Sequence, residues 1–117
     1  MRLYSIDDMT RTLYLIECKS TKGTSVPLSM IRSNQIKGLQ EASKHMLVAG
    51  MLINFRNENN DTFFLLIDEY LDMMKSLNKK SFNIKDLESI GATHVESTKK
   101  RTRYIYNIKK LVGELHL

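Results

Sequence analysis

Glu17 and Lys19 are the two residues whose types and spacing point most directly to chemistry. They stand two positions apart at the end of an apolar run, Leu13–Ile16, and a polar loop with one glycine follows over residues 20–27. Residues two apart in a strand share a face, so the carboxylate and the amine would lie side by side. Charge without a partner is costly to bury, so such a pair in an apolar strand needs a reason. A Mg²⁺-dependent nuclease supplies one, because it uses a carboxylate to hold the metal and a lysine to steady the attacking water.

The bulk composition indicates one globular domain spanning residues 1–117. The chain is 42% apolar and 26% charged, which is typical of a globular protein. No apolar run approaches about 18 residues, so no membrane-spanning helix and no membrane partner is expected. The single cysteine, Cys18, excludes an internal disulfide and fits a reducing cytosol. One cysteine and three scattered histidines make no zinc spacing.

The positive charge is concentrated at the C-terminal end of the sequence. Residues 1–96 contain 12 basic and 12 acidic side chains, whereas residues 97–117 contain six basic and one acidic. The whole net charge of +5 therefore lies in the last fifth of the chain. This asymmetry indicates an anionic partner contacted by the C-terminal segment.

The apolar periodicity predicts an α/β (α+β) fold with a mixed sheet flanked by helices. The expected strands are residues 2–6, 11–19, 51–56 and 62–67, with a late basic strand within 92–110. The expected helices are residues 33–49, 68–77 and 81–90, the first capped by Ser33. Gly50 and Gly91 are expected to end the first and the third helix. The order is ββαββα, followed by a short helix and the basic strand.

Several segments together resemble the RecU-like Holliday junction resolvases, especially their shorter phage-encoded relatives. The matching segments are Tyr14–Gly23, Val26–Leu28, Ile31–Ile36, Ser81–Ile84 and Leu87–Gly91. The resemblance implies a restriction-endonuclease-like fold and cutting of branched DNA with Mg²⁺ or Mn²⁺ by a homodimer. It also implies that Glu17 is a metal ligand, that Lys19 is the catalytic lysine and that Gln35 lies near the site on the following helix.

The same family requires an aspartate on the strand before Glu17, and the hairpin register predicts none there. With a turn at residues 7–10, antiparallel partners have numbers that sum to about 17 or 18, so Glu17 lies opposite roughly Met1. Asp7 and Asp8 then lie at the far end of the hairpin, roughly 23 Å from Glu17. The nuclease site is therefore expected to be incomplete, and Glu17 and Lys19 could be a strand-end ion pair. A partner subunit, a different register or residues upstream of Met1 could still supply the missing ligand.

The second candidate site is the basic C-terminal segment together with a loop lysine. Six cations and no acid across residues 97–110, interleaved with tyrosines, suit a nucleic-acid backbone and stacked bases. The alternative is a solvated edge strand protected by its cations. The candidate binding residues are Lys22, Lys99, Lys100, Arg101, Arg103, Tyr104, Tyr106, Lys109 and Lys110.

Two function classes follow from these sites. The first is a phage or mobile-element protein with a nuclease fold that binds DNA, structured RNA or a nucleic-acid enzyme without cutting, and that needs no cofactor. Its most concrete form, by analogy of size and phage relationship, is an anti-CRISPR inhibitor of an RNA-guided type II CRISPR DNA nuclease or its guide RNA. The alternative is an active Mg²⁺-dependent Holliday junction resolvase or structure-selective nuclease.

Overall fold

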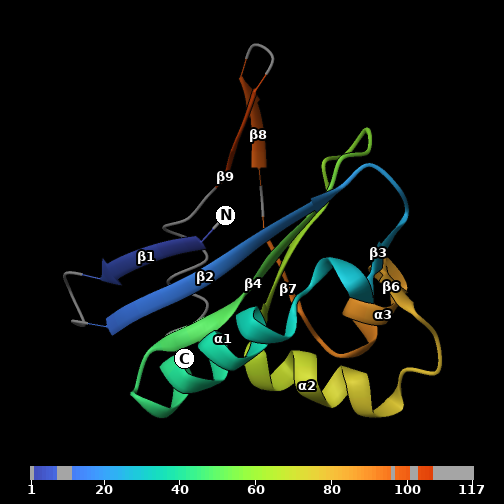
Figure 1. Cartoon of the computed structure of the whole chain (residues 1–117). Helices are drawn as coiled ribbons and strands as arrows, with labels where there is room; N and C mark the ends of the chain where they lie inside the picture. Colours follow the sequence, from blue (N-terminus) through green and yellow to red (C-terminus); the bar gives the residue numbers. More distant parts are fainter. Residues whose placement is uncertain (1, 8–11, 96, 101–102, 107–117) are drawn as a thin grey trace.

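A mixed five-stranded sheet forms the centre of the protein (Figure 1). The computed structural model describes residues 2–7, 12–95, 97–100 and 103–106. Along the sheet the strands are β1 (Arg2–Asp7), β2 (Thr12–Thr21), β4 (Val48–Phe55), β5 (Thr62–Leu66) and β7 (Thr93–His94). The β2–β4 pair is parallel and the other three pairs are antiparallel. The predicted mixed sheet flanked by helices is confirmed.

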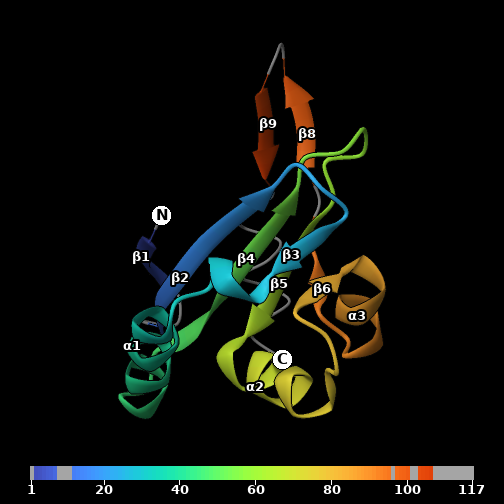
Figure 2. The same ribbon diagram turned by 45° about the vertical axis from the view of Figure 1, so that its right-hand side comes forward.

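Three helices pack on one face of this sheet, as Figure 2 shows. They are α1 (Ser33–Lys44), α2 (Ile67–Ser76) and α3 (Ile84–Ser89). Leu15, Met51 and Ile53 project from the sheet into this layer and form one core cluster with Leu39 of α1 and Tyr70 of α2. A second buried cluster lies on the other face of the sheet and consists of Tyr14, Ile16, Leu52, Phe64 and Val95. Its members from β2 and β4 alternate along each strand with those of the first cluster. Both faces of β2 and β4 are therefore apolar, as expected for strands that are covered on both sides.

A second, two-stranded sheet ties the loop after β2 to the start of α3. It pairs β3 (Ser25–Pro27) with β6 (Ser81–Asn83) and is centred on the buried pair Val26 and Phe82. A 3₁₀ turn, Leu28–Met30, follows β3. The sequence predicted a loop and a helix start for these segments, because runs of three residues carry too little periodicity to mark a strand. Gly91, at φ +74°, ends α3 as predicted.

The predicted end of the first helix is wrong by five residues. The helix ends at Lys44, where Met46 takes a left-handed conformation at φ +68°. The amide of Leu47 then bonds to the carbonyl of Ala42, at 3.0 Å, and this pattern closes the helix in the way a glycine usually does. Gly50 lies instead inside β4, where a Cβ atom would clash with the carbonyl oxygen of Leu65. This glycine permits close strand packing and does not stop a helix.

The late basic segment forms a two-stranded ribbon, where the sequence predicted a single strand. Its strands are β8 (Ser97–Lys100) and β9 (Arg103–Tyr106), which pair antiparallel with each other. Both views show this ribbon beyond the end of the five-stranded sheet at which β2 and β4 end (Figures 1 and 2). Within the described residues, no helix combines the length and the apolar character needed to cross a bilayer.

Candidate functional site

Glu17 is a buried carboxylate in an inner strand of the sheet. Its residue is only 3% exposed, and β2 holds it between Arg2 on β1 and Met51 on β4. Strand alternation places it on the face that the helices cover, together with Leu15. A charge in such a place requires hydrogen bonds or a counter-ion.

Two side chains that donate hydrogen bonds hold the two oxygens of Glu17. The guanidinium Nε of Arg2 donates to Oε2 at 3.0 Å, and the amide nitrogen of Gln35 on α1 donates to Oε1 at 3.3 Å. The amide oxygen of Gln35 accepts from the backbone N–H of Arg32 at 3.0 Å. That bond fixes the orientation of the amide, so its NH₂ group faces Glu17.

The predicted register of the first hairpin is wrong by one residue. Arg2 lies opposite Glu17, where Met1 was expected. The last strand pair is Asp7 with Thr12, so the connection starts one residue later than residues 7–10 and every partner moves with it. Asp7 is still five positions along the strand from the partner of Glu17, or about 17 Å, too far to share a ligand with it. The place of a second carboxylate therefore holds an arginine.

Gly38 of α1 leaves the space that the Arg2 side chain occupies. A Cβ atom at this position would lie 3.1 Å from Nη2 of Arg2, so any other residue would crowd the guanidinium. The hydrogen bond to Glu17 raises the pKa of Arg2, and this effect outweighs the opposing effect of desolvation. The arginine is therefore a permanent cation beside the buried carboxylate.

Lys19 lies one strand repeat beyond Glu17 on the same face of β2. It is half-buried and pairs in register with Ile53 of β4. Within the part of the chain that the structure describes, no ion pair involves Lys19, because Glu17 is held by Arg2. Glu17 and Lys19 therefore do not form a strand-end ion pair with each other.

The comparisons with known proteins identify the family. The family model described as Recombination protein U, RecU, matches residues 11–110. The chain belongs to the RecU family. It is also similar to the SPbeta prophage-derived uncharacterized protein YotM of Bacillus subtilis strain 168, at 36% identity over 118 residues. That match covers 88% of this chain, and the chain spans about 60% of the length of the relative.

The residues around Glu17 in this RecU-family chain do not fit a Mg²⁺ ion. Mg²⁺ takes oxygen ligands in octahedral geometry, whereas Glu17 is met by two nitrogen donors, one of them cationic. Among the described residues, no group of three histidine, cysteine, aspartate or glutamate side chains could hold a metal. Glu17 instead forms an ion pair with Arg2 and accepts a hydrogen bond from the amide of Gln35.

Six of the nine predicted binding residues of the RecU-family chain fall on two described segments at one end of the sheet. Lys22 is exposed in the loop between β2 and β3. Figure 2 shows the β8–β9 ribbon beyond the same end of β2. The ribbon carries five of the candidates, namely Lys99, Lys100, Arg103, Tyr104 and Tyr106. The other three, Arg101, Lys109 and Lys110, lie outside the described residues.

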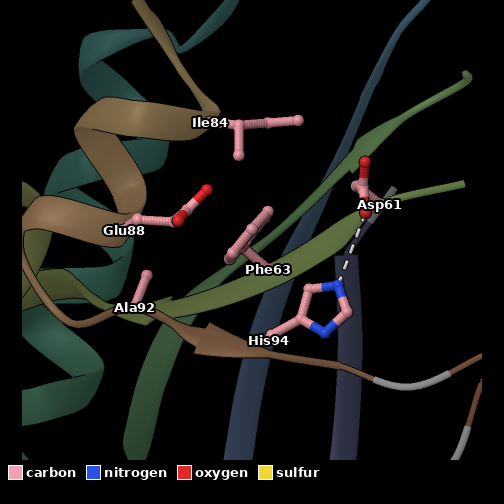
Figure 3. Close-up of a pocket in the computed structure, with 6 residues that line it drawn as sticks. All are labelled: Asp61, Phe63, Ile84, Glu88, Ala92 and His94. Atoms are coloured by element: carbon pink, nitrogen blue, oxygen red, sulfur yellow. Dashed lines mark ion pairs between the residues drawn. The ribbon is translucent and has the colours of Figure 1, made fainter. Parts of the chain in front are cut away.

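One hollow in the RecU-family chain was not predicted from the sequence. It has a volume of about 520 Å³ and lies between α3 and the edge of the sheet at β5 and β7 (Figure 3). Phe63 and Ala92 are in its wall, and the Glu88 side chain extends from α3 toward it. His94 bonds to Asp61 at 3.5 Å and packs edge-on against Phe63. These residues come from three separate segments and share no motif, so no sequence signal joins them.

Proposed function

We propose that this RecU-family chain binds nucleic acid, or an enzyme that acts on nucleic acid, without cutting it. Its most concrete role is that of an anti-CRISPR inhibitor in the cytoplasm of a bacterial host cell. In that role it binds an RNA-guided type II CRISPR DNA nuclease, or the guide RNA of that nuclease, and blocks assembly or target binding. It needs no metal cofactor.

The ion pair between Arg2 and Glu17 is the observation that carries this proposal. A metal-dependent nuclease needs the carboxylate oxygens for its cation, and here both oxygens accept from nitrogen donors. The guanidinium would also repel a divalent ion arriving at the same carboxylate. An active Mg²⁺-dependent resolvase or structure-selective nuclease is therefore the less favoured function for this site.

The uncompensated cations support binding to a polyanion. With Glu17 neutralised by Arg2, the charge of Lys19 is left available for phosphate at the end of β2. Lys22 is exposed in the next loop, and residues 97–110 carry six cations and no acid. Binding that rests on such cations needs no metal, because they replace the counter-ions of the nucleic-acid backbone directly.

The anti-CRISPR role is supported by the size and charge of the chain and by its relationship to a prophage protein. A phage gains from a small protein that occupies a host defence nuclease. A guide RNA is a dense polyanion with unpaired segments, which suits a basic surface that bears tyrosines. A homodimer, as the family resemblance implies, would present two such surfaces.

The binding test compares two variants that remove the same charge. In the first, three cations of the ribbon and Arg101, which lies outside the described residues, become alanine: K99A, K100A, R101A and R103A. The matched control changes four exposed cations outside the ribbon: K37A, K44A, R56A and K85A. Fluorescence anisotropy measures binding to labelled guide RNA, free and loaded in a type II nuclease, over a range of salt concentrations.

We expect the ribbon variant to lose affinity and to reduce the salt slope by about 3, while the control stays close to the wild type. Target cleavage by the nuclease should recover with the ribbon variant alone. Equal affinity for both variants, or a flat salt dependence of the wild type, would remove the ribbon from the mechanism.

The metal test uses Mn²⁺, a spectroscopically visible stand-in for Mg²⁺. The wild type should show no change in melting temperature with millimolar Mn²⁺. Arg2→Asp places a second carboxylate opposite Glu17, with Cβ atoms about 5 Å apart, and should gain stability with Mn²⁺. Cleavage of branched DNA by the wild type that is lost with EDTA and with Glu17→Ala would overturn the proposal and establish the nuclease.

A further inference from the structure

The β8–β9 ribbon is a separate structural unit at the end of the molecule. Among the described strands, β8 and β9 bond only to each other and not to the five-stranded sheet. Figures 1 and 2 both show it standing beyond the end of β2. A two-stranded ribbon exposes both of its faces unless another element covers one, so the residues on each face decide what it binds.

The register of the ribbon sorts its tyrosines and its cations. Tyr104 pairs with Lys99 and Tyr106 pairs with Ser97, whereas Arg103 pairs with Lys100. Directly paired residues share a face, and successive pairs alternate between the two faces. Both tyrosine positions therefore share one face with a single lysine, and two cations occupy the other. Tyrosines and cations are interleaved along the sequence, and only the pairing of β8 with β9 shows that they occupy different faces.

The spacing of the tyrosine positions matches a stacked nucleic-acid strand. Two residues along an antiparallel strand span about 6.8 Å. Successive nucleotides of a stacked strand are about 3.4 Å apart, so two steps cover the same distance. Any two aromatic rings separated by this distance leave room for one unpaired base between them. In a duplex the base faces are already stacked on each other and are not open to such a contact.

We infer that the Lys99–Tyr104–Tyr106 face of the β8–β9 ribbon binds unpaired bases of single-stranded nucleic acid. The inference rests on the proposed function, namely that this chain binds nucleic acid, and it names the class of ligand. Lys99 lies on the same face for the adjacent phosphate. Lys100 and Arg103, on the other face, add attraction for the backbone that does not depend on strandedness.

The test compares side chains of similar strand propensity with and without an aromatic ring. One variant carries Tyr104→Phe and Tyr106→Phe, and the other carries Tyr104→Leu and Tyr106→Leu. The control is Tyr4→Phe with its leucine counterpart, since Tyr4 is 70% exposed on β1, which does not pair with the ribbon. The ligands are a labelled single-stranded oligonucleotide and the duplex of the same sequence, measured by fluorescence anisotropy at fixed salt.

The wild type and the phenylalanine variant should prefer the single strand, and the leucine variant should lose about tenfold to a hundredfold in affinity for it. Duplex affinity should not change with either variant. Changing Lys100 and Arg103 to alanine should lower the affinity for both ligands and lower the salt slope of binding by about 1 to 2. Equal binding by the leucine and phenylalanine variants, or equal losses on both ligands, overturns the inference. A wild type that binds neither ligand contradicts nucleic-acid binding itself, which is a separate result.

Discussion

The contact between Arg2 and Glu17 predicts a coupling that can be measured through stability. Arg2→Met keeps a long side chain but removes the cation, and so leaves a carboxylate that is 3% exposed without its charged partner. Breaking a fully buried pair costs about 3–5 kcal/mol, whereas exposed pairs contribute about 0–1 kcal/mol. The Arg2 side chain is 38% exposed, so solvent screens part of the interaction. We therefore expect a loss of about 2 kcal/mol, between these limits.

Glu17→Gln tests the same contact from the other side. It removes the charge, keeps the shape and leaves an arginine that water can reach, so its cost should be nearer 1 kcal/mol. Once Glu17 is neutral, Arg2→Met should lower the free energy of unfolding by a smaller amount. The double variant should then be more stable than the sum of the two losses predicts, by about 1 kcal/mol or more.

Urea unfolding followed by circular dichroism measures all three variants, and thermal melting gives a second reading. A loss of 2 kcal/mol should lower the melting temperature by about 8 °C in a domain of this size. Arg56→Met is the matched control, because Arg56 is exposed and has no recorded ion pair within the described residues. The reasoning fails if Arg2→Met costs no more than this control, or if the coupling is below about 0.4 kcal/mol.

Three further outcomes follow from the packing and the titratable groups. Gly50→Ala should destabilise by about 3 kcal/mol in urea unfolding, because the new methyl group meets a backbone carbonyl that cannot move aside. Gly38→Ala should stabilise more in the Arg2→Met background than in the wild type, by about 0.5 kcal/mol, because the guanidinium no longer crowds the methyl group. Burial raises the pKa of Asp86, but its hydrogen bond to Lys79 at 2.8 Å and a backbone N–H outweigh it and lower the pKa overall. A lowered folded pKa gives stability that is present above the ordinary value of about 3.9 and lost as the pH falls through the folded pKa, so Asp86→Asn should flatten the loss of stability below about pH 4.

The elements with long periodic patterns could be predicted from the sequence, and their ends could not. The helix at α1 was expected because Ile36 and Leu39 repeat at helical spacing, but its end depended on a left-handed Met46. Methionine has no preference for the left-handed conformation, so the residue type gave no indication that the helix would end there. Gly50 was a misleading signal, because a glycine can end a helix or admit a neighbouring strand. Only the position of β5 distinguishes the two.

The sequence indicated Glu17 and Gln35 as candidate site residues, but it did not indicate Arg2 as the charged partner of Glu17. Glu17 and Gln35 were expected to lie near each other, and they are in contact. Arg2 had no motif to mark it, and its role depends on a register that one residue of turn length decides. Residues of the basic segment could be named as a set, whereas their division between two faces required the pairing of β8 with β9.

The position of Arg2 also explains why a buried glutamate is tolerated without a metal. In a metal-dependent nuclease the cation compensates the carboxylate, and a carboxylate that lacked it would be costly to keep inside the sheet. Here the guanidinium supplies that positive charge, and Gly38 provides the room for it. Glu17 then contributes to the stability of β1 and α1 against β2, while binding rests on residues at the end of the sheet. The two properties should therefore separate: Glu17→Gln should lower stability and leave nucleic-acid affinity unchanged, and loss of the ribbon cations should do the reverse.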